Sequence, residues 1–251
     1  MSADVLRLQK ALLREGYDPG PLDGQRGAKT QAALEAWQQA RLTWPTGVDV
    51  SKWQPQVDWA AVKGAGASFA ICKGTQGGGR DSLFATHWPA IKAAGLIRCT
   101  YHWFSPATPL LTQADTIYKA VGKLQPGDLP VALDIERDSA GADGQEGTAD
   151  DIKATDQMAE ELAKLVLDRT GKVPLIYSYS YYLAARNIEV PNCPLWIADY
   201  RSGPPTLPPG WTQYAIHQYA GDSGRHPGVT GPCDLNRFRG SLGDLRAMAG
   251  L

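Results

Sequence analysis

Two carboxylates stand at the end of a short apolar segment and are the residues best placed to do chemistry. The segment runs from Val131 to Ile135, between Pro130 and a polar loop, which predicts a buried strand of the kind found in parallel sheets. Because side chains alternate along a strand, Asp134 and Glu136 share a face, with Cα atoms roughly 6.5–7 Å apart. Two carboxylates this close cannot both ionise freely, so we expect a raised pKa on one, which then donates a proton at neutral pH. An ordinary strand end that meets solvent is the alternative.

Other acids also stand at predicted strand ends. Asp49 lies in Gly-Val-Asp-Val-Ser, Asp199 follows Leu-Trp-Ile-Ala, and Asp234 lies in Cys-Asp-Leu-Asn. Strand ends of one barrel converge, so acids far apart in the sequence can face a single pocket. General acid–base cleavage by carboxylates needs no metal, and we expect neither a metal nor a cofactor.

From residue 47 onward, strand patterns alternate with helix patterns. We predict strands at 47–50, 67–73, 96–103, 131–135 and 173–179, and helices at 57–63, 83–94, 109–123 and 149–169. After residue 179 the helical signal fades, and strands are predicted at 195–198, 214–219 and 233–236. Repeated βα units imply a largely parallel sheet or barrel.

The first 43 residues have a different, helical pattern. An amphipathic helix is predicted at 3–15, capped by Ser2 or Asp4 and stopped by Gly16. After a turn-rich loop, a second helix is predicted from 28 to about 41. The residues expected to be buried are Val5, Leu8, Leu12, Leu13, Ala33, Leu34 and Trp37.

Charge and composition exclude several classes of partner. The net charge of −1 argues against nucleic acid or an anionic membrane as a partner. No apolar run approaches the roughly 18 residues of a membrane span. The N-terminus lacks a basic head followed by an apolar core, so we expect synthesis in a cytoplasm without a secretory signal.

Cysteines, histidines and glycines give no further site. The cysteines at 72, 99, 193 and 233 lack zinc spacing, and we interpret them as buried thiols, with a Cys72–Cys99 bridge as the alternative. The histidines show no ligand spacing. The glycine-rich stretch 74–79 fits neither a P-loop nor a dinucleotide fingerprint, so we do not predict phosphate binding.

The chain resembles the glycoside hydrolase family 25 muramidases, the Chalaropsis-type lysozymes, from Gly47 to about Gly240. The matching segments, in order, are Gly47-Val-Asp-Val-Ser51 with Gln54 and Val57-Asp-Trp59, Lys73-Gly-Thr-Gln-Gly77 with Asp81, Thr100-Tyr-His-Trp103, Leu133-Asp-Ile-Glu136, Ile176-Tyr-Ser178, Leu195-Trp-Ile-Ala198, and His217-Gln-Tyr219 with Asp234-Leu-Asn236. Each is weak alone, but their order and spacing are specific. The resemblance implies an α/β fold, a flattened (βα)5β3 TIM-like barrel over residues 44–251.

Residues 1–43 resemble the peptidoglycan-binding module of cell-wall enzymes. The match includes Leu22-Asp-Gly24, Gly27 and Thr30, a turn that leads back into a helix, although phenylalanine often stands where this chain has Arg26 and Trp37. A helical cap that only packs on the larger domain is the alternative. So short a unit is near the lower size limit for independent folding and is expected to lean on its neighbour.

The resemblance also implies an activity and roles for residues. It implies hydrolysis, with retention, of the β-1,4 bond between N-acetylmuramic acid and N-acetylglucosamine in bacterial peptidoglycan. Separately, we expect the protein to be a monomer. Glu136 would protonate the leaving oxygen, while Asp134 would steady the attacking acetamide of the substrate or the charge that results. A route through an enzyme nucleophile stays open. Asp49 and Asp234 would complete an acidic floor. The residues expected to contact substrate are Tyr101, Tyr177, Trp196, Gln218, Lys73 and His102, although for His102 a buried core imidazole is the alternative.

Departures from the family pattern affect fine specificity more than activity. Trp103 replaces the usual phenylalanine, His217 the usual tryptophan, and Gln76 the usual glutamate. We interpret Asp199 as a solvated loop acid and do not assign it a catalytic role.

A wall hydrolase without a signal sequence resembles a phage endolysin released by a holin. The rival hypotheses are a wall-binding protein with an inactive barrel and a chitin-directed enzyme of the same barrel type.

Overall fold

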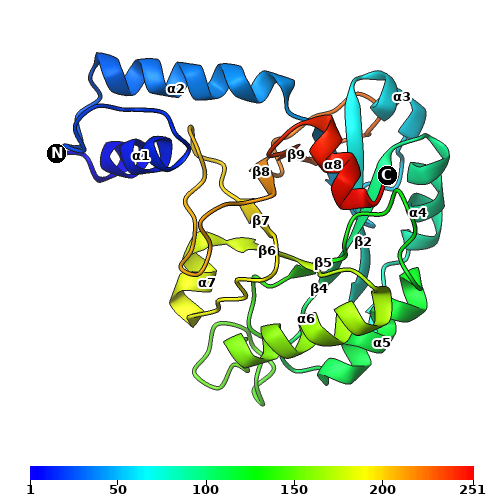
Figure 1. The fold of residues 1–251 in the computed structure, drawn as a ribbon. Coiled ribbons are helices and arrows are strands. Elements are labelled where there is room, and N and C mark those ends of the chain that lie inside the picture. The colour runs from blue at the N-terminus through cyan, green and yellow to red at the C-terminus, as the bar shows by residue number, and fades with distance from the viewer.

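The computed structural model describes all 251 residues, arranged as a pair of N-terminal helices beside a barrel (Figure 1). The helices are α1 (Ala3–Arg14) and α2 (Ala28–Ala40), and a 3-10 turn, η1 (Arg41–Thr43), follows them. The first strand of the barrel begins at Thr46. The predicted helices at 3–15 and 28–41 are therefore confirmed to within a residue at each end. No helix is long and apolar enough to cross a membrane.

The strands form one closed sheet. Their order is β1-β9-β8-β7-β6-β5-β4-β2-β3, and an additional β1–β2 pairing closes the barrel. The strands are β1 (Thr46–Val50), β2 (Ala67–Gln76), β3 (Gly79–Arg80), β4 (Ile97–Trp103), β5 (Ala132–Asp134), β6 (Leu175–Tyr179), β7 (Leu195–Ala198), β8 (Ile216–Ala220) and β9 (Asp234–Phe238). Pairing is parallel from β1 through β2, β4, β5, β6 and β7 to β8, and β9 is antiparallel to both β8 and β1. The predicted (βα)5β3 barrel is confirmed.

Helices lie outside the barrel: the first five connect its parallel strands, and the last follows the final strand, β9. They are α3 (Trp59–Gly64), α4 (Phe84–Ala93), α5 (Leu110–Val121), α6 (Asp156–Thr170), α7 (Ser180–Arg186) and α8 (Leu242–Ala249). The glycine-rich stretch 74–79 contributes to the hairpin between β2 and β3, in which Gln76 pairs with Gly79.

Three features of the helices correct the sequence predictions. The helix predicted from residue 149 begins at Asp156, because Thr155 caps it and Ile152 pairs with Ser139 in the preceding loop. The sequence predicted no helix after residue 179, yet α7 and α8 are present. For α8 a signal existed: Ser241 and Asp244 form a capping box, in which each side chain accepts a hydrogen bond from the other residue's backbone N–H.

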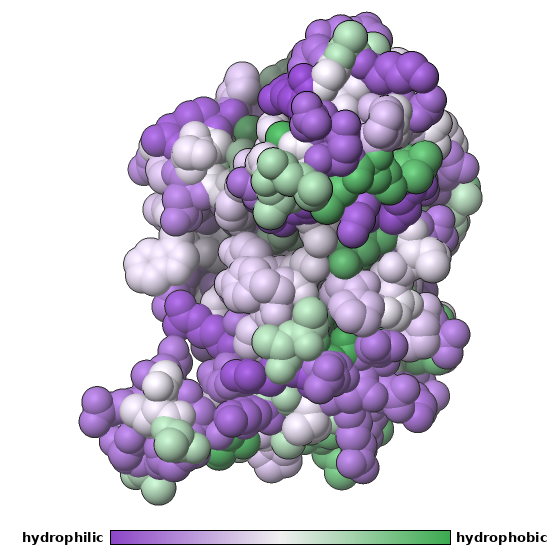
Figure 2. All heavy atoms as spheres, turned by 90° about the vertical axis from the view of Figure 1, so that its left-hand side faces the viewer, coloured by the Kyte–Doolittle hydropathy of each residue, from purple (hydrophilic) through white to green (hydrophobic).

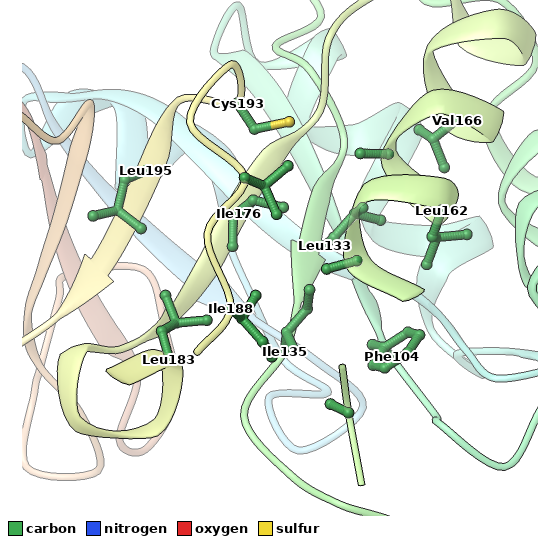
Figure 3. Packing of buried hydrophobic residues seen from close by; sticks show 14 of the residues in the cluster. Phe104, Leu133, Ile135, Leu162, Val166, Ile176, Leu183, Ile188, Cys193 and Leu195 are labelled. Carbon is green, nitrogen blue, oxygen red and sulfur yellow. The ribbon is translucent and has the colours of Figure 1, made fainter. Parts of the chain in front are cut away.

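The largest apolar core lies between the sheet and α6 (Figure 3). Leu162 and Val166 on α6 point toward Leu133 of β5 and Ile176 of β6, and all four side chains are fully buried. This continuous burial explains why β5 reads as an unbroken apolar segment. Truncating Leu133 to alanine would cost about 2–5 kcal/mol, the usual range for a buried leucine. The core therefore fixes the strand whose end carries the two carboxylates.

The cysteines are buried free thiols, as predicted. Cys72 pairs in register with Thr100, so the neighbouring Cys99 points to the other face of the sheet. Cys72 packs among residues under the helices, whereas Cys99 packs among residues of the barrel interior. The alternative of a Cys72–Cys99 bridge is therefore wrong.

The helical pair has a small core of its own. It consists of Leu8, Leu12, Ala33, Leu34 and Trp37, whereas the predicted core residue Leu13 is 51% exposed. Ser2, not Asp4, caps α1. Contacts with the barrel supplement this core, since Arg14 Nη2 donates to the Pro205 carbonyl over 2.7 Å and Arg239 Nε lies 3.0 Å from Glu15 Oε2. The helical pair thus leans on the barrel.

Candidate active site

One pocket at the carboxyl ends of the parallel strands collects the predicted acids. Its volume is about 80 Å³, and its wall consists of 9 residues: Asp49, Tyr101, Trp103, Asp134, Glu136, Tyr177, Trp196, Gln218 and Asp234. Strands β1, β4, β5, β6, β7, β8 and β9 each contribute to this wall, and Glu136 follows two residues after the end of β5. Residues separated by up to 185 positions therefore meet because the barrel closes. The four carboxylates expected to converge do so.

Asp49 and Asp234 form the floor of the pocket as a cross-strand pair. They stand opposite each other in the antiparallel register of β1 and β9. Burial raises the pKa of Asp49, although hydrogen bonds from Asn236 and Gln218 oppose that change. Burial, followed by the charge of Asp49, raises the pKa of Asp234 to about 8. The pair therefore retains a proton at neutral pH.

Gln218 connects this floor to the aromatic wall. Its Nε2 donates to Asp49 Oδ2 over 3.0 Å and to Asp234 Oδ2 over 3.2 Å. Its Oε1 accepts hydrogen bonds of 2.8 Å from the hydroxyls of Tyr177 and Tyr200. These four partners fix the orientation of the amide, because only one orientation gives every donor an acceptor.

A second amide donates to the same oxygen of Asp49. Asn236 Nδ2 donates to Asp49 Oδ2 over 2.7 Å, and Asn236 Oδ1 accepts from Trp196 Nε1 over 2.8 Å. Both amides lie in the barrel and are about 1% exposed or less. A buried network with its partners satisfied is rigid, so the position of the Asp49 carboxylate is preset.

Asp134 and Glu136 face the pocket from the end of β5. Asp134 is 3% exposed, and its Oδ1 has no hydrogen-bond partner. Burial, and then the charge of Glu136, hold the pKa of Asp134 well above its ordinary value. Burial raises the pKa of Glu136 to about 7, with a smaller contribution from Asp49. The sequence predicted a raised pKa on one of the two carboxyl groups; burial raises it on both and outweighs the repulsion between the two charges.

Lys73 lies beside the pocket rather than in its wall. Its Nζ donates to Gln76 Oε1 over 2.8 Å and lies 4.6 Å from the centroid of the Trp103 ring. Its positive charge acts against burial and lowers the pKa of both Asp134 and Glu136. Lys73 therefore limits how strongly the carboxyl pair holds its protons.

Two predicted positions differ from expectation. His102 is fully buried outside the pocket, where its ring nitrogens contact Thr75 Oγ1 at 2.7 Å and Gln113 Oε1 at 2.8 Å, so the core-imidazole alternative describes its place. Asp199 is not a solvated loop acid. It is 7% exposed and forms a two-bond ion pair with Arg201, at 2.8 Å and 2.7 Å. It does not line the pocket.

Three residues of the site escaped the sequence reasoning: Trp103 in the wall, and Asn236 and Tyr200 in the hydrogen-bond network. Strand alternation was a usable signal for two of them. Trp103 is two residues from Tyr101 along β4, and Asn236 is two residues from Asp234 along β9, so each shares a face with a predicted site residue. Tyr200 lies in a loop, where no such periodicity applies.

Comparison with known proteins gives consistent matches over nearly the whole chain. The model described as Glycosyl hydrolases family 25 matches residues 48–229, and the model described as Putative peptidoglycan binding domain matches residues 1–48. Lysozyme M1 of Streptomyces globisporus is 32% identical, covering 93% of this chain and 84% of that protein. The N,O-diacetylmuramidase of Chalaropsis sp is 31% identical, covering 81% of this chain and 98% of the relative. The crystal structure of the bacterial lysozyme from Streptomyces coelicolor superposes with a TM-score of 0.70 and 32% identity, covering 82% of this chain and 97% of that one.

Proposed function

The chain belongs to glycosyl hydrolases family 25, and from this membership we propose that it is a peptidoglycan muramidase. It hydrolyses the β-1,4 bond between N-acetylmuramic acid and N-acetylglucosamine, with retention of configuration. One observation carries the proposal: Asp49, Asp134, Glu136 and Asp234 meet in one pocket and hold their protons unequally. The relatives whose names are lysozyme and N,O-diacetylmuramidase support the same substrate class.

Glu136 is the general acid of the proposed mechanism. With a pKa of about 7, a substantial fraction is protonated at neutral pH and can pass its proton to the glycosidic oxygen as the bond from that oxygen to the sugar C1 breaks. The acetamide oxygen of the substrate then bonds to C1 from the opposite face. Water, deprotonated by Glu136, opens this cyclic intermediate at C1, so two inversions give net retention.

Asp134 positions the acetamide in this scheme. Asp134 lines the pocket and its Oδ1 has no hydrogen-bond partner within the protein, so the N–H of an acetamide that enters the pocket would supply this carboxyl group with a partner. That hydrogen bond orients the acetamide oxygen toward C1 and stabilises the positive charge that develops on the group. If Asp134 were instead the nucleophile, it would form a covalent glycosyl-enzyme. Mass spectrometry of protein quenched during turnover would then show the added mass, and we expect none.

We propose that residues 1–43 bind the cell wall and that residues 44–251 form the hydrolase. The match of the first 48 residues to a putative peptidoglycan binding domain supports this division. A pull-down on purified walls, made with Glu136→Gln so that the walls stay intact, should retain the protein. Truncation of the Trp37 side chain, which lies in the core of the helical pair, should weaken retention.

We also propose that the protein acts as a monomer and serves as a phage endolysin that a holin releases from the cytoplasm. A sedimentation experiment checks the oligomeric state. Cells that express the protein from the cytoplasm should lyse only when a holin is co-expressed. Lysis without a holin would contradict the endolysin proposal and leave the muramidase proposal intact.

Turbidity clearing of purified walls tests the activity itself. Glu136→Gln should slow clearing by at least roughly 10²-fold, the low end of what a general acid contributes. Glu161→Gln, an exposed glutamate on α6, is the matched control and should clear at the wild-type rate. Equal clearing by wild type and Glu136→Gln would overturn the enzymatic proposal and favour a wall-binding protein. Mass spectrometry of the fragments should show reducing muramic acid ends, whereas reducing N-acetylglucosamine ends would contradict the muramidase proposal.

A further inference from the structure

A groove between α1 and the barrel adjoins the catalytic pocket. It has a volume of about 430 Å³ and is lined on the barrel side by Tyr179, Tyr181, Tyr200 and Arg201 and on the α1 side by Arg7. Both parts of the chain therefore contribute to one wall. In Figure 1, α1 lies beside the loops that follow β7, and Figure 2 shows this face, with pale residues of intermediate hydropathy across its middle.

The groove lies next to the pocket, because residues of the two walls contact each other. The Tyr200 hydroxyl, from the groove, donates to Gln218 Oε1, in the pocket, over 2.8 Å. The Tyr179 ring, from the groove, lies 6.4 Å from the Tyr177 ring of the pocket. A polymer bound at Glu136 that extends on this side of the pocket would reach the groove.

The barrel side of the groove presents aromatic faces that the core does not cover. Tyr181 is 72% exposed and Tyr200 is 48% exposed. The Tyr179 ring lies 5.5 Å from Tyr181 and 6.3 Å from Tyr200, so the three rings form one cluster. Exposed aromatic rings with a polar hydroxyl combine an apolar face with a hydrogen-bonding edge, which suits a sugar ring.

The α1 side presents a cation without an anionic partner. Arg7 forms no salt bridge, its Nε is buried without a hydrogen-bond partner, and its Nη1 meets only Thr206 Oγ1 at 3.4 Å. Asp199 also lines the groove and attracts Arg7, but both Asp199 oxygens accept hydrogen bonds from Arg201, so the two guanidinium groups share one carboxylate. Asp4 is the other acid within electrostatic reach. A guanidinium that forms no ion pair of its own, next to an aromatic groove, is suited to a carboxylate ligand.

We infer that the groove binds the glycan strand beyond the cleaved bond, and that Arg7 binds a carboxylate of the stem peptide that the muramic acid carries. This inference rests on the proposed muramidase function. Tyr181 and Tyr200 contact the sugar rings, and Arg7 reads the acidic peptide attached to them. The N-terminal helices then form part of the substrate groove and do more than attach the enzyme to the wall.

Kinetics on two soluble substrates test the inference. One is glycan strands that keep their stem peptides, and the other is the same strands after an amidase has removed the peptides. Arg7→Gln should raise KM roughly fivefold on the peptide-bearing strands, as expected for one partly exposed charged contact, and leave kcat unchanged. On peptide-free strands its KM should equal that of wild type. Arg7→Lys keeps the charge and should recover part of the loss.

Control variants separate recognition from packing. Lys10→Gln removes an exposed positive charge from the same helix, outside this groove, and should leave both substrates unaffected. Arg14→Gln removes the hydrogen bond from α1 to the Pro205 carbonyl and so weakens the seating of α1 without changing the groove wall. It should not reproduce the peptide-dependent change. Tyr181→Ala should raise KM on both substrates, because the sugar contact does not depend on the peptide.

The outcomes distinguish this inference from the proposed function. If Arg7→Gln behaves as wild type, or changes both substrates equally, or if Arg14→Gln gives the same peptide-dependent effect, the role of Arg7 is overturned. In each of these cases wild type still cleaves both substrates in a Glu136-dependent way, and the muramidase proposal stands. If wild type cleaves neither substrate, the proposed function itself fails.

Discussion

Replacing Glu136 by glutamine should stabilise the protein at alkaline pH while it removes activity. Burial raises the pKa of this side chain from an ordinary value of 4.5 to about 7. The unfolded chain therefore loses this proton at a lower pH than the folded chain does. The contribution of Glu136 to the free energy of unfolding is fully present below pH 4.5. It is lost as the pH rises through the folded-state pKa of about 7.

The size of the effect follows from the same pKa values. Between the unfolded and folded values, the free energy of unfolding falls by about 1.4 kcal/mol per pH unit. The total is about 3 kcal/mol, and the partial solvent exposure of the side chain reduces it to roughly 2 kcal/mol. Glutamine has nearly the same shape and never ionises. Glu136→Gln should therefore be more stable than wild type by roughly 2 kcal/mol at pH 8 and equally stable at pH 4.

Calorimetric melting at pH 4 and pH 8 measures this difference. For a protein of this size, roughly 2 kcal/mol corresponds to about 4–8 °C in Tm. The quantity to compare is the Tm difference between variant and wild type, because ionisable groups that do not interact with residue 136 then cancel. Glu161→Gln is the control and should show the same small difference at both pH values. A Glu136→Gln difference that is independent of pH, or larger at pH 4, would refute the reasoning that the pocket forces a proton onto Glu136.

Three other predictions follow from the charges around the site and in the core. The charge of Asp49 adds to burial in raising the pKa of Glu136. Asp49→Asn should therefore move the alkaline limb of the kcat/KM profile to lower pH. A pH–rate series on soluble glycan that shows the opposite shift would contradict this prediction. Lys73 lowers the same pKa, so Lys73→Met should move that limb to higher pH in the same assay, and an unchanged limb would count against its role. Arg98 Nε lies 2.6 Å from Oδ1 of the buried Asp128. Arg98→Met leaves that carboxylate unpaired and should lower the free energy of unfolding by roughly 3–5 kcal/mol, measured by urea unfolding. A loss below roughly 1 kcal/mol would argue that the pair is dispensable.

The order of elements and the identity of the key acids could be predicted from the sequence alone. These features are local patterns, which can be recognised from neighbouring residues alone. They are the apolar segment before Asp134, the Gly-Val-Asp segment around Asp49 and the alternation of strands with helices. Burial on both faces makes a parallel strand continuous in hydrophobicity, so most strands were predicted to within a few residues. The sequence analysis did not predict α8, although Ser241 and Asp244 have the spacing of a capping box.

Closure of the barrel decided what the linear pattern could not. Whether His102 faces a pocket or a core depends on what packs around it, and the structure surrounds it with Thr75 and Gln113. The sequence predicted a solvated Asp199, whereas the folded loop buries this side chain and pairs it with Arg201.

The raised pKa values and the groove beside α1 likewise come from tertiary packing. Burial is the largest cause of the high pKa of Glu136, and burial is a property of all the elements around a residue rather than of its neighbours in sequence. The meeting of Arg7 with Tyr200 joins positions almost two hundred residues apart, and no local periodicity encodes such a contact. The sequence by itself determined which groups can do chemistry; the packed barrel decided which of them share a solvent-poor pocket and therefore hold a proton.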